Sequence, residues 1–173
     1  WFDWVNRVDS PLMIIGQDWG PYVHLKKYIE DPSRDHFASS RTEKFIIANL
    51  DSINPELINT VFFTVAVVFT RTGNLFRGNQ NYNERKSFEI SYPYVSRQID
   101  IVRPKAIFTL GGLAFKAVNR HFNLHSDNLK LSQIVDQGII NTNRTAIIPA
   151  YHPAAFIDPQ IQLQAWRLLN NYL

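Results

Sequence analysis

Short apolar runs, separated by longer segments of mixed polarity, dominate the pattern of this chain. The runs lie at 12–15, 61–69, 106–110 and 145–149, and they are rich in isoleucine, valine and phenylalanine. Continuous apolar runs of this length are typical of strands that are buried on both faces of a parallel sheet. The sequence therefore predicts a central sheet of four strands, mostly parallel.

Helical patterns fill the segments between the strands. Apolar residues recur at helical spacing in five segments: 22–32, 42–51, 88–102, 111–122 and 160–173. The segment 123–142 has no clear period, and we expect a short strand near 133–135. Alternating strands and helices predict an α/β fold, in which a three-layer α/β/α arrangement forms one domain over residues 1–173.

Composition narrows the classes of protein that the chain can belong to. Its 173 residues are 45% hydrophobic, which is typical of a globular domain, and no apolar run approaches the roughly 20 residues that cross a bilayer. With no cysteine, neither a disulfide nor a cysteine-held iron–sulfur cluster can form. The first residues lack the pattern of a secretory signal, so we expect a cytoplasmic protein with no membrane partner. The net charge of +3 is compatible with nucleic-acid binding but does not require it.

Polar or glycine-containing segments follow all four predicted strands. They are Gly16–Gln17–Asp18, the polar loop 70–86, Gly111–Gly112 and Tyr151–His152–Pro153. In a parallel sheet the carboxyl ends of the strands meet at one edge, where ligands bind in open α/β folds. A carboxylate and an imidazole at this edge are candidates for acid–base chemistry.

These segments resemble the motifs of a known family, the uracil-DNA glycosylase superfamily. Residues 16–21, Gly-Gln-Asp-Trp-Gly-Pro, resemble its first motif, and 152–154, His-Pro-Ala, resemble its last motif, His-Pro-Ser. Residues 110–114 are similar to a strand-to-helix turn of the superfamily, and 72–74 to the Pro-Gly-Asn of its iron–sulfur branch. The resemblance covers nearly the whole chain in the right order. It implies a uracil-DNA glycosylase-like fold whose partner is single- or double-stranded DNA with a damaged base.

The resemblance also implies roles for residues at the site. Asp18 lies where the family has the carboxylate that orients the attacking water and stabilises the oxocarbenium-like sugar. His152 matches the histidine that donates a hydrogen bond to the carbonyl of the departing base. Phe37 matches the aromatic residue that stacks on the flipped base, and Gln17 would contribute backbone contacts to that base.

Further positions are expected to contact the DNA backbone. Gly111 and Gly112 at a helix start would offer N–H groups to a phosphate, and Arg71, Arg77 and Arg85 would follow the strand electrostatically. Phe156 is a candidate wedge that enters the base stack.

Each of these assignments has a structural alternative. Asp18 is also a typical turn-forming residue, and His152 could hydrogen-bond loop carbonyls. The glycines at 111–112 would equally serve tight helix–strand packing, and Phe156 could anchor the last helix.

The sequence departs from the family pattern at several places. Val65 stands where an asparagine reads the edge of uracil, and Thr64 could replace it only if the strand register slipped by one residue. Gly20 stands where a tyrosine excludes the methyl group of thymine, so the pocket could admit larger bases. Ala154 replaces the serine of the last motif.

The resemblance thus implies a DNA glycosylase-like hydrolase of base-excision repair, which we expect to act as a monomer with no metal or cofactor. One alternative is a superfamily member that binds nucleic acid without excising a base, as Val65 would suggest. A small-molecule α/β hydrolase or nucleotide-binding domain is a further alternative. It is disfavoured because the sequence contains no Gly-x-Gly-x-x-Gly, P-loop or Gly-x-Ser-x-Gly pattern.

Overall fold

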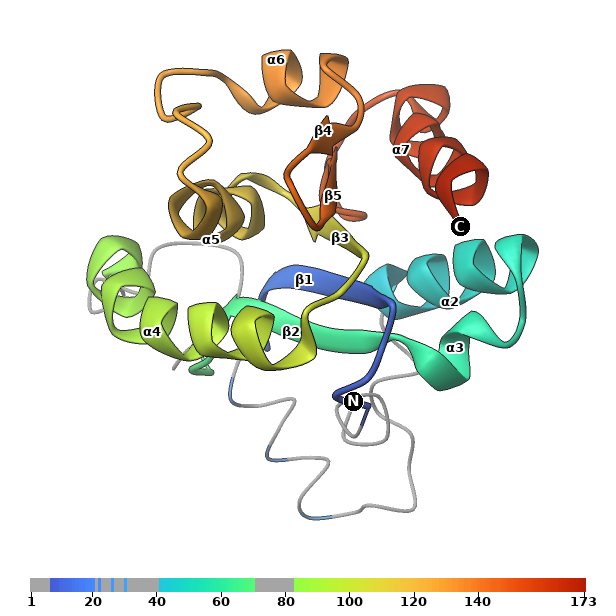
Figure 1. The fold of residues 1–173 in the computed structure, drawn as a ribbon. Helices are drawn as coiled ribbons and strands as arrows, with labels where there is room; N and C mark the ends of the chain where they lie inside the picture. The colour runs from blue at the N-terminus through green and yellow to red at the C-terminus, as the bar shows by residue number, and fades with distance from the viewer. Residues whose placement is uncertain (1–6, 21, 23–25, 27–29, 31–40, 71–82) are drawn as a thin grey trace.

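A sheet between two layers of helices forms the framework of the molecule (Figure 1). The computed structural model describes residues 7–20, 22, 26, 30, 41–70 and 83–173. The predicted helix 22–32 is described only at Tyr22, Lys26 and Glu30, which are all helical. Most of the polar loop 70–86 lies outside the described residues.

The sheet contains five strands in the order β2-β1-β3-β5-β4. Their bounds are β1 (Leu12–Asp18), β2 (Phe62–Val67), β3 (Ala106–Leu110), β4 (Ile140–Asn141) and β5 (Ala146–Ala150). All neighbouring strands are parallel except β4, which runs antiparallel to β5. From β1 the chain passes to β2 on one side and then returns to β3 on the other. The direction of strand addition therefore reverses between β1 and β3, which is the position where open α/β sheets bind ligands.

Helices cover both faces of this sheet. One face packs against α2 (Arg41–Ile53), α3 (Leu57–Thr60) and α7 (Pro159–Tyr172). The other packs against α4 (Glu84–Val102), α5 (Gly112–Phe122) and α6 (Leu131–Asp136). No helix in the described part of the chain is long and apolar enough to span a membrane.

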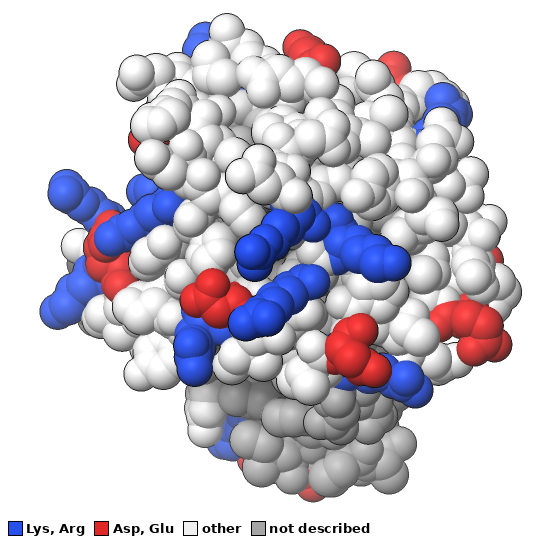
Figure 2. All heavy atoms as spheres, in the orientation of Figure 1, with Lys and Arg blue, Asp and Glu red and all other residues white. Residues whose placement is uncertain are grey.

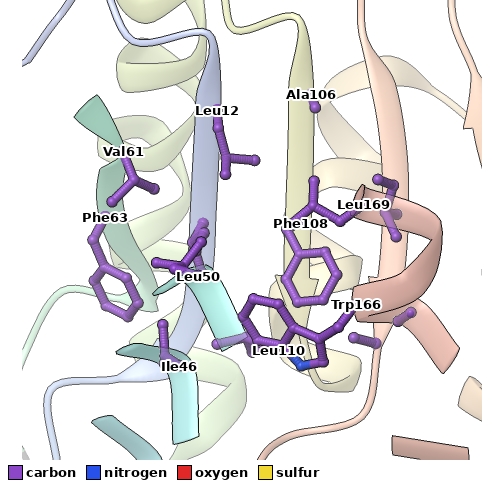
Figure 3. Close-up of a cluster of buried hydrophobic side chains, with 14 of the residues drawn as sticks. Leu12, Ile46, Leu50, Val61, Phe63, Ala106, Phe108, Leu110, Trp166 and Leu169 are labelled. Carbon is purple, nitrogen blue, oxygen red and sulfur yellow. The ribbon is translucent and has the colours of Figure 1, made fainter. Parts of the chain in front are cut away.

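Alternation along β1 explains why the core has two halves. Leu12 and Ile14 belong to the cluster on the α2 side, whereas Met13 and Ile15 belong to the cluster on the α4 side. All four are fully buried, as expected for a strand with helices on both faces. Figure 3 shows the α2-side cluster, in which the ring centroids of Phe108 and Trp166 lie 4.4 Å apart.

The structure confirms the α/β class and the mostly parallel sheet, and corrects details. The prediction of four strands omitted β4, which has only two residues. The strand expected near 133–135 is wrong, because residues 131–136 form α6. Gln133 Oε1 accepts a hydrogen bond from the Lys130 N–H at 2.9 Å, which stabilises this helix start. Helix α4 begins at Glu84 instead of 88, since the Asn83 side chain caps it by accepting from the Lys86 N–H at 2.9 Å.

Candidate active site at the carboxyl edge of the sheet

Asp18 and His152 lie at the same level of the sheet. The register pairs Ile15 with Thr109, and Thr109 with Pro149. Asp18 is three residues beyond Ile15, and His152 is three residues beyond Pro149. Their strands, β1 and β5, flank β3, so two interstrand spacings, or about 10 Å, separate these two strands. Asp18 is the last residue of β1, and His152 lies two residues beyond the end of β5, so both are at the carboxyl edge of the sheet.

A turn at the end of β1 fixes the Asp18 carboxylate. The Gly20 N–H donates to Asp18 Oδ1 at 2.8 Å, and Gly20 has a φ of 77°, which glycine adopts without strain. Asp18 is therefore a turn-forming residue, as its structural alternative predicts. The same bond holds the carboxylate in a defined orientation at the sheet edge. In β1, alternation places Asp18 on the same side as Leu12, Ile14 and Gly16, which is the α2 side.

Backbone contacts also fix the tautomer of His152. The Ala154 N–H donates to His152 Nδ1 at 3.1 Å. A neutral imidazole that accepts at Nδ1 carries its proton on Nε2, so Nε2 is the hydrogen-bond donor of this side chain. The carbonyl of His152 accepts from the Ala155 N–H at 2.8 Å and from Gln162 Nε2, on α7, at 3.2 Å. The turn that carries His152 is thereby held to the last helix.

Gly111 joins the ends of β3 and β5. Its N–H donates to the Ala150 carbonyl at 2.8 Å, and a Cβ at this position would lie 3.4 Å from His152 Cβ. With a φ of 97°, Gly111 has a conformation that other residues rarely adopt. The N–H is committed to Ala150, so the expectation that it binds a phosphate is corrected. Gly112 is exposed in the first turn of α5, where N–H groups lack partners within the helix, and it keeps that role as a prediction.

The neighbouring strand β2 presents no base-reading group at this edge. Val65 pairs with Gly16 and is fully buried, and a Cβ at Gly16 would lie 3.4 Å from Val65 Cγ1. The register has no slip. Thr64 is buried on the α4 side, where its hydroxyl donates to Gln98 Oε1 at 2.7 Å. The structure thus does not bring Thr64 to the site, whereas Gln17, half-buried beside Asp18, does lie there.

Phe156 is fully exposed in the turn after His152, with a relative exposure of 103%. This exposure excludes the alternative in which its ring anchors the last helix. Phe37, Arg71 and Arg77 lie outside the described residues.

Glu43 is a buried acid that the sequence reasoning missed. It is only 5% exposed in the first turn of α2, and it shares a helix face with Ile46, three residues later. Figure 3 shows Ile46 toward the Leu110 end of the strands and Leu50 toward the Leu12 end. Glu43 is thus in the helix that covers the Asp18 side of the sheet. The only sequence signal was the Ser-x-x-Glu spacing at 40–43, which is typical of a helix start.

A separate cavity lies at the opposite edge of the sheet. It has a volume of about 470 Å³, and it is lined by Pro11, Ile53, Asn54, Leu57, Lys105, Asn170, Tyr172 and Leu173. Pro11 and Lys105 directly precede β1 and β3, so this cavity opens at the amino ends of the strands. It therefore contains neither Asp18 nor His152.

The strand order and the helices on both faces define an α/β protein in which the direction of strand addition reverses between β1 and β3. Asp18 and His152 lie at the carboxyl ends of the strands on either side of β3, which is where open α/β sheets commonly bind ligands. A comparison with protein families identifies the family within this class of protein. The model of the Uracil DNA glycosylase superfamily matches residues 2–170, and the chain belongs to this superfamily. A search of curated proteins gave no match.

Proposed function

We propose that this protein is a DNA glycosylase that hydrolyses the N-glycosidic bond of a deaminated base, such as uracil, in base-excision repair. Membership of the superfamily supports a glycosylase-like role in general. The observation that carries the specific proposal is the placement of Asp18 and His152 at one level of the sheet edge, on either side of β3. A flipped nucleotide at this edge would lie between a carboxylate and a hydrogen-bond donor.

Asp18 would act on the sugar and on the attacking water. As the bond from C1′ to the base nitrogen breaks, its electron pair leaves with the base and positive charge develops on the sugar. A fixed carboxylate stabilises that charge, and it orients a water that adds to C1′ and gives up a proton. The Gly20 N–H bond to Asp18 Oδ1 supports this role because it holds the carboxylate in place before substrate binds.

His152 would act on the departing base. Since Nδ1 accepts from the Ala154 N–H, the Nε2–H is the group that can donate to a base carbonyl. Negative charge accumulates on that carbonyl as the base leaves, and a neutral donor stabilises it without giving up its proton. For this role His152 needs to carry its proton on Nε2, and the hydrogen bond from the Ala154 N–H to Nδ1 favours that tautomer.

Base recognition would depend mainly on shape and stacking. The glycosidic bond is shielded in the duplex, so the nucleotide has to leave the base stack. We expect Phe37 to stack on the flipped base, Gln17 to contact it, and the exposed Phe156 to fill the space it leaves. Gly20 lacks a side chain that would exclude larger bases. Gly112, Arg71 and Arg77 remain the predicted phosphate contacts near the site.

A second candidate function is nucleic-acid binding without excision. The buried Val65 favours it, because no amide stands there to read the edge of a base. A site that reads a base by hydrogen bonds loses orders of magnitude in discrimination when the reading group is absent. In this second function the same sheet edge would bind a nucleotide and leave its glycosidic bond intact.

Base release from oligonucleotides separates the two candidates. Single- and double-stranded DNA carrying uracil, hypoxanthine or xanthine would be incubated with the wild type, with Asp18→Asn and with Asp51→Asn, a matched change at an exposed residue of α2. We expect release by the wild type and Asp51→Asn, and a loss of about 10²- to 10⁴-fold in Asp18→Asn. DNA binding without release would support the second candidate. Equal release by all three proteins would remove Asp18 from the mechanism.

A further inference from the structure

Three cations surround one acid on the outer surface of α4 and α5. Arg120 Nη1 lies 2.7 Å from Glu89 Oε2, and Arg85 and Lys116 also act electrostatically on the Glu89 carboxylate. All four side chains are exposed. Three positive charges and one negative charge leave a net charge of +2 at this place. Figure 2 shows lysine and arginine side chains with acidic ones among them over α4 and α5, at the left of the view.

Two of these cations are held over aromatic rings. Lys116 Nζ lies 4.8 Å from the centroid of the Phe88 ring, and Arg120 Cζ lies 4.1 Å from the centroid of the Tyr92 ring. Long cationic side chains on a merely solvated helix face sample many rotamers, whereas contacts with ring faces restrict them. Binding of an anion would therefore lose less conformational entropy, because these side chains are already partly ordered. The arrangement is therefore suited to binding.

The position of the cluster connects it to the candidate active site. Helix α4 begins after the connection from the carboxyl end of β2, and α5 begins after the carboxyl end of β3. Lys116 is four residues beyond Gly112, which corresponds to about 6 Å along the helix axis. The preceding residue, Gly111, lies against His152. Arg120 is eight residues beyond Gly112, or about 12 Å along the axis, so the cations lead away from the edge where a flipped nucleotide would lie.

We propose that Arg85, Lys116 and Arg120, the α4–α5 cation cluster, bind backbone phosphates of the DNA strand beside the flipped nucleotide, and that Glu89 limits this binding by holding Arg120. The inference rests on the proposed function for its choice of DNA as the partner. Phosphate oxygens would compete with the carboxylate for the guanidinium of Arg120. The Arg120 hydrogen bond lowers the pKa of Glu89, so the acid stays charged at neutral pH and competes throughout.

The proposal predicts that removing a cation and removing the acid change DNA affinity in opposite directions. The association constant K for DNA falls as salt rises, so log K against log salt has a negative slope. Lys116→Gln should make this slope less steep by about 0.7 to 0.9, which corresponds to the loss of one phosphate contact. It should also weaken DNA binding about five- to tenfold at ~0.1 M salt. Glu89→Gln should release Arg120 from its carboxylate partner. The negative slope should then become steeper by a similar amount, and DNA binding should strengthen about five- to tenfold. Fluorescence anisotropy with an undamaged labelled oligonucleotide measures both variants over a salt series.

Matched controls come from the amino edge of the sheet. Lys105→Gln and Glu56→Gln make the same charge changes at exposed residues directly before β3 and α3. We expect both to leave the salt slope close to that of the wild type. If they match Lys116→Gln and Glu89→Gln in affinity and slope, only net charge matters and the proposal is overturned. Because the readout is binding to undamaged DNA, a protein that releases no base can still show the predicted slopes. Conversely, base release with unchanged slopes would overturn this inference alone.

Discussion

The two edges of the sheet use their polar groups in different ways. At the amino edge, Ser10 Oγ donates to the Leu12 carbonyl at 2.6 Å and accepts from the Phe62 N–H at 3.1 Å. Thr145 Oγ1 similarly donates to the Pro104 carbonyl at 2.9 Å. These buried hydroxyls join neighbouring strands to each other. At the carboxyl edge, Asp18 and His152 are half-buried and accept bonds from N–H groups of their own turns.

This difference separates residues that stabilise the fold from the residues that we propose contact a ligand. A buried hydroxyl between strands contributes to the free energy of folding, because its loss leaves backbone groups without partners. The half-buried Asp18 is instead oriented by the N–H of Gly20 in its own turn, and it lies at the carboxyl end of β1. The cavity of about 470 Å³ lies at the amino edge, and neither Asp18 nor His152 lines it. Mutations at the two edges should therefore affect different measurements.

The largest expected effect is on catalysis at the carboxyl edge. Asp18→Asn should lower kcat for base release by about 10²- to 10⁴-fold, while the free energy of unfolding changes by less than about 1 kcal/mol. The amide oxygen of asparagine can still accept from the Gly20 N–H, so the turn should survive. Single-turnover base release and urea unfolding measure the two quantities. A large decrease in the free energy of unfolding would mean that Asp18 is mainly structural. The two edges would then not differ in the way described above.

At the amino edge the expected effect is on stability alone. Ser10→Ala should lower the free energy of unfolding by about 1 to 3 kcal/mol, because the buried N–H groups of Leu12 and Phe62 lose their shared acceptor. Base release at a temperature where the variant is folded should equal that of the wild type. Slower release by the folded variant would show that the two edges are coupled.

Substitution of Gly111 should affect both stability and base release. Gly111→Ala should cost about 1 to 3 kcal/mol of stability, since alanine is strained at a φ of 97°, and it should slow base release because the new methyl group would contact His152. Gly112→Ala is the matched control, since a Cβ there would meet open space. We expect the control to be neutral or to stabilise the protein by up to about 1 kcal/mol. Equal effects of the two substitutions in thermal unfolding and base release would contradict this interpretation of Gly111.

The sequence was informative wherever the signal was local and repeated. Buried strands show as apolar runs, so the strand containing Leu12 and the strand containing Phe108 were both predicted correctly. Because parallel strands end at one edge, the same runs also predicted that Asp18 and His152 would share that edge. The shared edge was thus predicted through the fold, and the roles of Asp18 and His152 stay predictions.

Features set by tertiary contacts could not be predicted in this way. Ile134 and Val135 form an apolar pair that fits a strand or a helix turn, and packing within the α4-side cluster selects the helix. The hydrogen bond from Gly111 to Ala150 depends on how two distant strands end. Burial of Glu43 follows from the placement of α2 over the sheet, which no period in the sequence specifies.

The smallest predicted effect is a dependence of stability on pH that arises from His121. This residue lies in the last turn of α5, with Nδ1 2.9 Å from Ser96 Oγ and Nε2 3.8 Å from Asp100 Oδ1. Burial lowers the pKa of His121 below its ordinary value of 6.5, although the Asp100 carboxylate acts in the opposite direction. In the unfolded chain the imidazole therefore gains its proton at a higher pH than in the folded protein.

The sign of the effect follows from this order of protonation. Well above pH 6.5 both states hold a neutral imidazole, and the group adds no pH dependence. As the pH falls below that value the unfolded state binds the proton first, so the free energy of unfolding decreases until the folded state is protonated as well. Urea unfolding between about pH 7.5 and about pH 5 should show a smaller decrease in His121→Gln than in the wild type, and a larger one in Asp100→Asn, which lacks the opposing charge. The opposite ranking of the two variants would show that the Asp100 ion pair outweighs burial. The kcat for base release should not follow this titration, because His121 lies at the end of α5 remote from Gly111 and His152.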